Sequence, residues 1–223
     1  MFQKVLIAED MDFINSGIKS QLSELGIPQI EYVQYCDEAL LKLKCAKLLD
    51  KEPYDLLISD LSFEEDGKMQ QLKGGEDLVQ AVRKEFPTLK IVVFSIEDKI
   101  FTIQKLFDSF NINGYVWKSR DGLRELKQAL QKIYNSESIY ISPNCAQAIA
   151  KRNIIEIEDY DIFLIECLSN GYLQEEISEK LKKIKWSPTS ISAIEKRLKF
   201  LREHFNANNP AHLVAIAKDL GLV

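Results

Sequence analysis

The sequence predicts an α/β protein in two parts: a doubly wound, five-stranded parallel sheet, followed by a second domain made only of helices. Two observations support this prediction. Through the first 135 residues, short continuous apolar runs alternate with longer segments of helical period, which is typical of a repeated strand–helix unit. Beyond residue 153 no strand pattern returns. Continuous apolar runs of this kind are typical of parallel strands that helices cover on both faces.

The five predicted strands are rich in Val, Ile and Leu and are bounded by polar or turn-forming residues. They are KVLIA at 4–8, QIEYVQ at 29–34, DLLIS at 55–59, KIVVFS at 90–95 and GYVW at 114–117. Each strand precedes a segment in which apolar residues recur every three to four positions, which predicts a helix. These helices are expected over 13–25, 37–49, 76–86, 99–110 and 123–134. Gly26 and Pro28 end the first helix, and Pro87 follows the third.

The C-terminal part is predicted to be helical and to follow a polar connector. The first domain is expected over 1–135, the connector over 136–153 and the helical domain over 154–223. A short helix is expected from Pro143 within the connector. The helices of the second domain are predicted near 159–170, 174–181, 192–205 and 210–220.

The composition is that of an ordinary globular protein and excludes several other classes. The 223 residues are 46% hydrophobic and 28% charged. No window approaches the roughly 20 apolar residues of a membrane span, and the apolar run Val5–Ala8 is far shorter than that of a signal peptide. We therefore expect a cytoplasmic protein with no membrane partner. The four cysteines and two histidines lack the spacing of a zinc site or a disulfide framework.

The charge differs between the two parts of the chain. Residues 1–150 carry 18 Lys and Arg against 23 Asp and Glu, whereas residues 151–223 carry 11 of each. Within the neutral part, Lys180–Arg202 holds eight basic residues against one acid, Glu195. An acidic first part and a local basic band in the second indicate two separate functions.

Charged and polar residues close the predicted strands, and they share one edge of the sheet. Glu9 and Asp10 follow the first strand, Asp60 follows the third, and Ser95 and Lys118 close the fourth and fifth. In a doubly wound sheet, ligands bind at the carboxyl ends of the strands, where the strand order switches. Carboxylates about 4 Å apart repel by roughly 4 kcal/mol per pair at an effective dielectric near 20. A cation is therefore expected among them.

Mg²⁺ fits this set of residues and implies phosphate chemistry. Mg²⁺ takes hard oxygen ligands, keeps several waters and is commonly held by one or two carboxylates together with phosphate oxygens. With the ion and Lys118 neutralising phosphoryl oxygens, Asp60 is placed to attack phosphorus and form an acyl phosphate. Ser95 would then donate a hydrogen bond to the new phosphoryl group.

Together with the motif GYVWKS, these positions resemble the receiver domain of two-component response regulators over about residues 3–135. The resemblance implies a flavodoxin-like fold. It implies that Asp60 accepts the phosphoryl group from a sensor histidine kinase and that Ser95 and Lys118 contact that group. Tyr115 would be the aromatic residue that changes rotamer with Ser95. The metal ligands that the resemblance implies are Glu9, Asp10, Asp60 and the backbone carbonyl of Ser62.

The segment after Asp60 departs from that family. Receivers usually continue through a Met-Pro turn to a glycine, whereas here Asp60 is followed by LSFEEDGKMQQLKGG, and the equivalent glycine is Gly75. The loop is longer by about seven residues, and loops of such length beside a site are usually functional or mobile. It also brings Glu64, Glu65 and Asp66 near the acceptor. Our hypothesis is that the loop tunes partner choice or the rates at which the acyl phosphate forms and is hydrolysed.

The C-terminal part of the chain, over about residues 156–222, resembles the helix-turn-helix domain of the NarL/FixJ/LuxR class. The resemblance is carried by Leu168, Gly171 and the segments EEISEKL and SAIEKRLKFLREHFNANNPAHLVAIAKDLGL. Two features depart from that class. The segment KKIKWSPTS lengthens the turn by about six residues, and Glu195 occupies a position that is commonly basic. An acid near phosphate is unfavourable, although a glutamate can accept a hydrogen bond from cytosine.

The predicted recognition helix has an apolar face for docking and a polar face for DNA. Its apolar positions are Ile194, Leu198, Leu201 and Phe205. The DNA contacts expected on the other positions are Ser192, Lys196, Arg197, Lys199 and Arg202. Lys196 and Lys199 are the leading candidates, and the two arginines are candidates for contacts with phosphate.

The favoured function is that of a regulator and not of an enzyme: a two-component response regulator that is phosphorylated on Asp60 and acts as a DNA-binding transcription regulator. Dimerisation on phosphorylation is expected, because paired modules can occupy two half-sites. The alternative is a signalling adaptor whose helical domain binds protein. A third possibility, a phosphatase that uses Asp60, is less favoured because no second acid or base is spaced near it.

Overall fold

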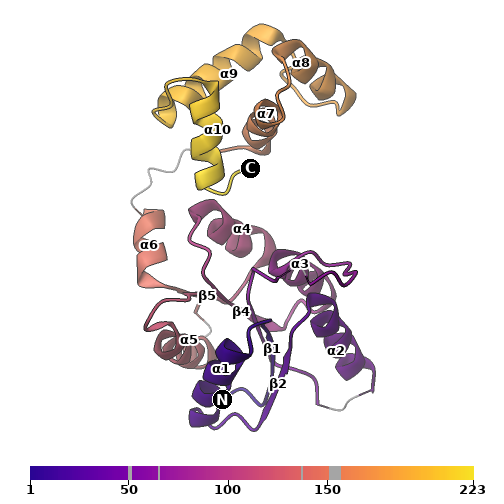
Figure 1. The fold of residues 1–223 in the computed structure, drawn as a ribbon, viewed down its shortest axis with the longest axis vertical. Helices are drawn as coiled ribbons and strands as arrows, with labels where there is room; N and C mark the ends of the chain where they lie inside the picture. The colour runs from indigo at the N-terminus through magenta and orange to yellow at the C-terminus, as the bar shows by residue number, and fades with distance from the viewer. Residues whose placement is uncertain (50–51, 65, 137, 151–156) are drawn as a thin grey trace. The chain divides into compact units, whose positions relative to one another are not determined.

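The chain divides into two compact units (Figure 1). A computed structural model describes residues 1–49, 52–64, 66–136, 138–150 and 157–223. The first unit consists of Met1–Asp98 with Ile103–Ala150, and the second is made mainly of the helices beyond residue 156. Residues 151–153 of the predicted connector and the predicted start of the helical domain, 154–156, lie outside the described residues.

A parallel sheet forms the centre of the first unit, with strand order β2-β1-β3-β4-β5-β6. The strands are β1 Lys4–Ala8, β2 Gln29–Val33, β3 Leu56–Ser59, β4 Lys90–Ser95, β5 Gly114–Trp117 and β6 Tyr140–Ile141. The order of the first five strands is that of flavodoxin-like sheets, in which the direction of strand order switches between β1 and β3. The prediction of a doubly wound α/β fold with a second, helical part is confirmed.

The described sheet has six strands, so the predicted count of five was wrong by one. The additional strand, β6, has two residues, which are too few for the alternation of apolar and polar residues to be visible in the sequence. β6 pairs with Gly114 and Tyr115 of β5. The hydroxyl of Ser142, just beyond it, accepts a hydrogen bond from the Trp117 amide at 2.8 Å and donates one to Glu125.

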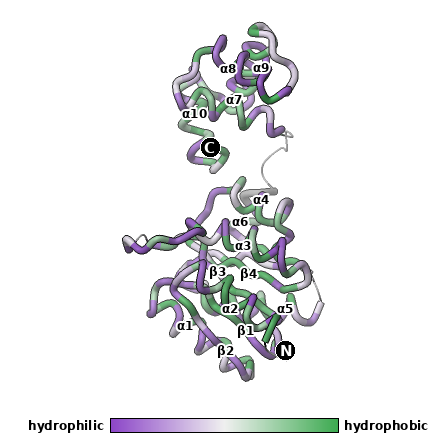
Figure 2. Tube along the Cα trace, turned by 90° about the vertical axis from the view of Figure 1, so that its right-hand side faces the viewer, coloured by the Kyte–Doolittle hydropathy of each residue, from purple (hydrophilic) through white to green (hydrophobic). Residues whose placement is uncertain are grey.

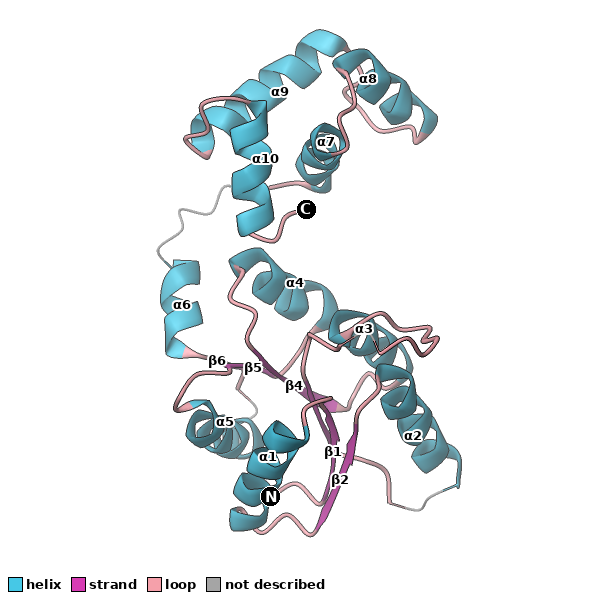
Figure 3. Ribbon diagram, viewed as in Figure 1, coloured by secondary structure: helices cyan, strands magenta, loops and turns pink. Residues whose placement is uncertain are grey.

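Helices flank both faces of the sheet, with α1 and α5 on one side and α2, α3 and α4 on the other (Figure 3). Their bounds are α1 Asp12–Glu24, α2 Cys36–Leu49, α3 Gly75–Glu85, α4 Ile100–Phe110, α5 Gly122–Ser136 and α6 Pro143–Ala150. The first five agree with the predicted helices to within two residues, and α6 begins at Pro143 as expected.

The alternation of side chains along each strand divides the core into two layers. On β1, Val5 and Ile7 pack with α1 and α5, whereas Leu6 and Ala8 pack with the opposite helices. Every residue of β1 and β3 is buried. These strands therefore appear in the sequence as continuous apolar runs, and the first polar residues after them stand at the edge of the sheet.

Four described helices form the second unit: α7 Asp159–Ser169, α8 Gln174–Lys183, α9 Ile191–His204 and α10 Pro210–Asp219. They share one apolar core, to which α9 contributes Ile194, Leu198 and Leu201. In Figure 2 the hydrophilic colour of this unit is concentrated on α8 and α9. Throughout the described part of the chain, no helix combines the length and the apolar character needed to span a bilayer.

Candidate functional site

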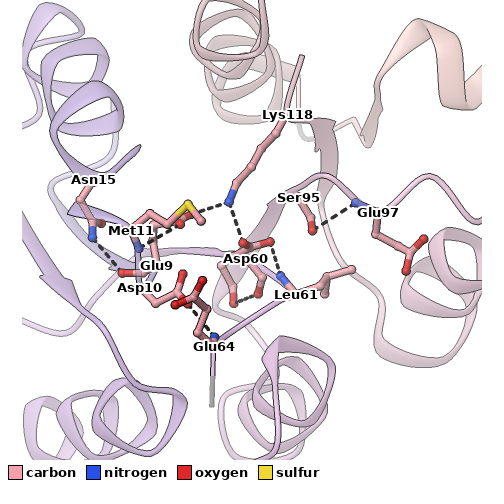
Figure 4. Close-up of polar contacts among 11 residues, drawn as sticks. Glu9, Asp10, Met11, Asn15, Asp60, Leu61, Glu64, Ser95, Glu97 and Lys118 are labelled. Carbon is pink, nitrogen blue, oxygen red and sulfur yellow. Dashed lines mark hydrogen bonds and ion pairs between the residues drawn. The ribbon is translucent and has the colours of Figure 1, made fainter. Parts of the chain in front are cut away.

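Three carboxylates meet at the edge where β1 and β3 end (Figure 4). Ala8 and Ser59 are paired across these adjacent strands, so the residues that follow them are neighbours as well. Carboxylate oxygens of Glu9, Asp10 and Asp60 all lie within 4.8 Å of one another. The prediction that acids from two strands share one place is therefore confirmed by the geometry.

Lys118 extends from the end of β5 into this acidic cluster. Its ammonium donates hydrogen bonds to Glu9 Oε2 at 2.7 Å and to Asp60 Oδ2 at 2.6 Å. The Lys118 side chain is only 9% exposed, and its ammonium also lies 5.6 Å from the centre of the Phe94 ring. The lysine is therefore held in a fixed position between two acids that come from different strands.

The cluster has more negative than positive charge. Burial of Glu9, which is 1% exposed, raises the pKa of its carboxyl group, and the adjacent Lys118 opposes that rise. One ammonium faces three carboxylates, so a further cation would stabilise the ionised forms. Ligand oxygens of one octahedral Mg²⁺ lie at most about 4.2 Å apart, so a slight contraction of the cluster would suffice. The hard oxygen ligands of the cluster are those that Mg²⁺ takes.

Ser95, which lies near Asp60 in Figure 4, and Tyr115 contact the same short segment after β4. Ser95, at the end of β4, is fully buried, and its Oγ accepts a hydrogen bond from the Glu97 amide at 3.4 Å. Tyr115, on β5, is also fully buried, and its hydroxyl donates to the Glu97 carbonyl. Burial raises the pKa of the Tyr115 phenol well above its usual range. Ser95 and Tyr115 therefore both hold the segment after β4 through hydrogen bonds to the backbone of Glu97.

The first residue of α3, Gly75, lies directly against the backbone of Asp60. A Cβ added at Gly75 would lie 1.8 Å from the Asp60 carbonyl oxygen. The Gly75 amide donates to the Leu61 carbonyl at 3.0 Å, and the Leu61 amide donates to Asp60 Oδ1 at 2.6 Å. Only glycine permits this approach, so Gly75 sets the position of the Asp60 backbone.

The long loop between β3 and α3 is tied to its surroundings at both ends. Near its start, the Glu64 amide donates to Asp10 Oδ2 at 2.7 Å. Near its end, the Asp37 carboxylate at the start of α2 accepts from the amides of Gln71 at 2.7 Å and Leu72 at 3.0 Å. Glu65 of this loop lies outside the described residues. The loop therefore contacts the acidic cluster itself, through a carboxylate that is a candidate metal ligand.

A cavity of about 600 Å³ opens over the cluster. Its polar lining includes Asp10, Asp60, Ser62 and Lys118, and its apolar lining includes Met11, Phe13, Ile14, Phe94, Ile96 and Leu123. Phe13 is 85% exposed at the start of α1. Asp10 and Asp60 therefore line an opening to solvent with an apolar rim, whereas Glu9 is buried beneath it.

In the second unit, the predicted DNA contacts lie on the side of α9 that faces away from its core. Ser192, Lys196 and Lys199 are exposed and Arg202 is partly exposed. Ser190 caps the helix by accepting from the Ala193 amide at 3.3 Å. The apolar positions expected to dock this helix are the buried ones, apart from Phe205, which is partly buried.

Arg197 differs from the other predicted DNA contacts, because the acid that it binds within its own unit is fully buried. Lys199 has only a 3.8 Å ion pair with the exposed Glu203. The Nε and one terminal nitrogen of Arg197 donate to the two carboxylate oxygens of Asp161, each at 2.6 Å. This bidentate pair joins α9 to α7, and it raises the pKa of the Arg197 guanidinium. The sequence carried no signal of this pair, since 36 residues separate its members.

Residues 5–131 match the family model of the response regulator receiver domain. The match covers more than half of the 223 residues and includes every member of the acidic cluster and Lys118. The chain belongs to the response regulator receiver family. In its receiver domain the three acids meet at Lys118, and Ser95 and Tyr115 are buried.

Relatives and solved structures similar to this response regulator match from 80% to 98% of the chain. Response regulator GacA of Pseudomonas aeruginosa is 25% identical over 187 residues, which are 80% of each chain. A solved RcsB–DNA complex matches 98% of this chain and 98% of that chain, at 20% identity with a TM-score of 0.65. RcsB of Salmonella enterica serovar Typhimurium, bound to promoter rprA with a phosphomimetic, matches 98% and 99% at 20% identity with a TM-score of 0.63. A further RcsB structure, with a TM-score of 0.63 at 21% identity over 98% of each chain, contains two dimers bound to two DNAs. The likeness to RcsB shows the fold.

Proposed function

We propose that Asp60 of this response regulator accepts a phosphoryl group from a sensor histidine kinase, and that its helical unit binds DNA to regulate transcription. The observation that carries the first part is the meeting of Glu9, Asp10 and Asp60 within 4.8 Å, with Lys118 hydrogen-bonded to two of them. A nucleophilic carboxylate, hard oxygen ligands and a fixed ammonium in one opening are the groups that phosphoryl transfer requires.

The metal ligands in this proposal are the carboxylates of Glu9, Asp10 and Asp60 and the backbone carbonyl of Ser62, which lines the same cavity. When bound, Mg²⁺ would neutralise charge on the phosphoryl oxygens. The proposal is supported by the donor set, since carboxylate and carbonyl oxygens are the ligands that this ion takes.

In the transfer itself, a carboxylate oxygen of Asp60 forms a bond to phosphorus while the bond from phosphorus to the kinase histidine nitrogen breaks. The imidazole leaves, and the product is an acyl phosphate. The Leu61 amide, 2.6 Å from Asp60 Oδ1, orients the nucleophile. Lys118 exchanges its 2.6 Å contact with Asp60 for the incoming phosphoryl oxygens, which carry more charge.

Ser95 and Tyr115 would transmit the change away from the site. A phosphoryl group brings nearly two negative charges and strong acceptor oxygens, and a move of the Ser95 hydroxyl toward it breaks the contact with the Glu97 amide. Tyr115 holds the carbonyl of the same residue. Repacking of this segment would shift an equilibrium toward a form that dimerises.

The support for DNA binding is a face of α9 on which Ser192, Lys196 and Lys199 are exposed, together with the fold shared with RcsB, which has been solved in complex with DNA. Lysine suits contacts with phosphate. Arg197 is the exception among the proposed contacts, since the Asp161 carboxylate occupies two of its donors. Arg202 remains a candidate for phosphate.

The protein-binding alternative is favoured by one observation. Ile191 and Phe200 are 39% and 40% exposed on α9, and Glu195, one turn after Ile191, is exposed as well. Exposed apolar residues next to an acid are typical of a surface that binds protein rather than DNA. Binding to random duplex across a range of salt concentrations separates the two, because a DNA-binding protein loses affinity steeply as salt rises.

The proposal extends to the organisation of the chain. The receiver domain is placed over 1–135, the connector over 136–153 and the DNA-binding domain over 154–223, in a cytoplasmic regulator without enzymatic activity of its own. Dimerisation on phosphorylation is supported by RcsB, a relative in fold whose dimers have been solved on DNA.

Incubation with acetyl phosphate and Mg²⁺, followed by intact-mass measurement, tests the first part of the proposal. We expect the protein to gain one phosphoryl group, and both Asp60→Asn and omission of Mg²⁺ to abolish the gain. An Asp60→Asn protein that is phosphorylated as fast as the wild type would remove Asp60 from this role.

A further inference from the structure

The end of α8 and the turn that follows it form an exposed basic segment, residues 182–188, which we call the α8–α9 turn. Lys182, Lys183 and Lys185 are all exposed, and among the described residues none of them makes an ion pair. No Asp or Glu occurs between Glu179 and Glu195. Three ammonium groups therefore stand together in solvent with no acid nearby in the sequence to balance them.

The α8–α9 turn is held in one shape by contacts with its own unit. The Trp186 amide donates to the Leu181 carbonyl at 3.0 Å, and the Tyr160 hydroxyl donates to the Pro188 carbonyl at 2.6 Å. The Trp186 ring packs edge to face against Phe163, with ring centres 5.6 Å apart. The backbone that carries the lysines is thus fixed before any partner arrives, which lowers the entropic cost of binding.

Helix stability accounts for two of the lysines but not for the third. Lys182 and Lys183 lie in the last turn of α8, where positive charge offsets the helix dipole. Lys185 lies beyond the helix at a φ of 58°, in the left-handed region that favours glycine or asparagine. A lysine at this position has a conformational cost, and its ammonium makes no hydrogen bond or ion pair with the described residues. Its charge is the property that distinguishes it from glycine there.

The α8–α9 turn adjoins the outer face of α9. Ser187 and Pro188 line a hollow of about 400 Å³ together with Lys196 and Phe200 of α9. The last residues of the turn and Lys196 of α9 therefore line one hollow, and Lys185 lies two residues before Ser187 in the chain. No acid of the described structure other than Glu158 lines this hollow.

We propose that the α8–α9 turn binds the phosphate backbone of duplex DNA beside the segment that α9 contacts, through Lys182, Lys183 and Lys185. This inference rests on the proposed DNA-binding function. The expected ligand is the DNA phosphodiester, because lysine ammonium groups on flexible side chains bind phosphate oxygens as point charges. Contacts with phosphate do not depend on the base sequence. The longer turn thus enlarges the contact with DNA without changing the bases that are recognised.

The test compares two variants of the whole 223-residue chain that lose the same three charges. One is K182Q/K183Q/K185Q in the turn, and the control is K19Q/K84Q/K218Q, whose lysines are exposed elsewhere. Each protein, treated with acetyl phosphate and Mg²⁺, is titrated onto a fluorescent random-sequence duplex at several salt concentrations. The slope of log affinity against log salt should fall by about 0.9 for each lysine that reaches a phosphate. At 0.1 M salt this is roughly an eightfold loss of affinity per contact.

Each outcome bears on a different statement. A smaller slope in the turn variant, with the slope of the control unchanged, supports the inference. A wild-type protein that binds with a steep slope, and a turn variant that binds identically, would overturn the inference and leave DNA binding intact. Equal losses in both variants would also overturn it, since net charge alone would be responsible. Absence of salt-dependent binding by the wild type would overturn both the inference and the DNA-binding function.

Discussion

Asp161 and Arg197 join the first and third helices of the C-terminal unit through two hydrogen bonds of 2.6 Å. The Asp161 side chain is fully buried, whereas that of Arg197 is partly exposed. The same carboxylate accepts from the Glu158 amide at 3.1 Å and so caps the start of α7. One buried acid therefore positions both the helix that it caps and the helix proposed to contact DNA.

The first prediction concerns the stability of this pair. Arg197→Ala leaves a buried carboxylate without its cation, which should lower the free energy of unfolding of the helical unit by about 3 kcal/mol. Arg197→Lys should be intermediate, because lysine cannot form the bidentate contact. The measurement is urea unfolding followed by Trp186 fluorescence in a Trp117→Phe background. Arg202→Ala is the matched control, and its free energy of unfolding should change by less than about 0.5 kcal/mol. Equal losses of stability in both variants would contradict a specific role for the pair of Arg197 and Asp161.

The second prediction concerns Gly75. A methyl group at this position would overlap the Asp60 carbonyl, which lies 1.8 Å from the added Cβ, so Gly75→Ala must displace the acceptor or the start of α3. A displacement of about 1 Å at a reacting group can slow a reaction about a hundredfold. We expect slower phosphorylation by acetyl phosphate, followed by intact mass. Gly74→Ala is the control, since its added Cβ would meet the Leu61 carbonyl at 3.2 Å and needs only a small shift; similar rates in both variants would refute the prediction.

The third prediction uses Lys118 to separate binding of the ion from transfer of the phosphoryl group. Lys118→Ala removes a positive charge from beside Glu9 and Asp60, so the affinity for Mg²⁺ should rise. Phosphorylation should nevertheless slow by about a hundredfold, because a donor to the phosphoryl oxygens is lost. Calorimetry with Mg²⁺ and mass measurement with acetyl phosphate follow the two quantities. A decrease in both the Mg²⁺ affinity and the phosphorylation rate would contradict the prediction and indicate a misfolded variant. Lys118→Arg is the control, because it keeps the positive charge.

The fourth prediction concerns the β3–α3 loop. Asp37→Ala removes the carboxylate that accepts from the amides of Gln71 and Leu72. The loop should then open more often, so that trypsin cleaves after Lys68 and Lys73 faster than in the wild type. Asp37→Asn, which keeps an acceptor oxygen, is the control. If the loop tunes phosphotransfer as hypothesised, the rates of acyl phosphate formation and hydrolysis should change in the variant that trypsin cleaves faster. Faster cleavage of the loop with unchanged acyl phosphate rates would dismiss that hypothesis.

The fifth prediction concerns the cysteines. Burial raises the pKa of Cys36 to about 12 and that of Cys145 to about 11, and it also raises the pKa of Cys167. Because the thiolate is the reactive form, these groups should resist iodoacetamide at pH 8. Cys145 should become reactive only as the pH approaches 11, and Cys36 only at still higher pH. Cys45 is exposed and should be modified first. Peptide mapping before and after unfolding checks this order.

Much of the receiver site was predictable because it depends on regular structure. Residues such as Asp10, Asp60 and Lys118 directly follow apolar strands, and parallel strands bring their carboxyl ends to one edge. The sequence therefore shows which side chains meet, even though the strands lie far apart in the chain. Gly75 was identified differently, as the glycine equivalent to that of other receivers, and only the structure shows how close its backbone lies to Asp60.

The features that sequence reasoning missed are single contacts between distant side chains. The tie between Asp37 and the long loop, and the pair formed by Arg197 and Asp161, leave no periodic pattern. Arg197 was expected to face DNA phosphate, because helical spacing gives the side of a helix but not the acid that a neighbouring helix presents. Two-residue strands such as β6 are invisible for a similar reason, since alternation needs a longer run.

The pairing of β6 with β5 has a practical consequence for anyone who wishes to produce the receiver alone. A protein that stops at residue 135 would lack Tyr140 and Ile141, and the backbone groups of β5 that they now satisfy would be exposed as a free sheet edge. Such an edge invites pairing with other molecules and aggregation. A truncation after Ala150 keeps that edge covered and should yield the better-behaved material.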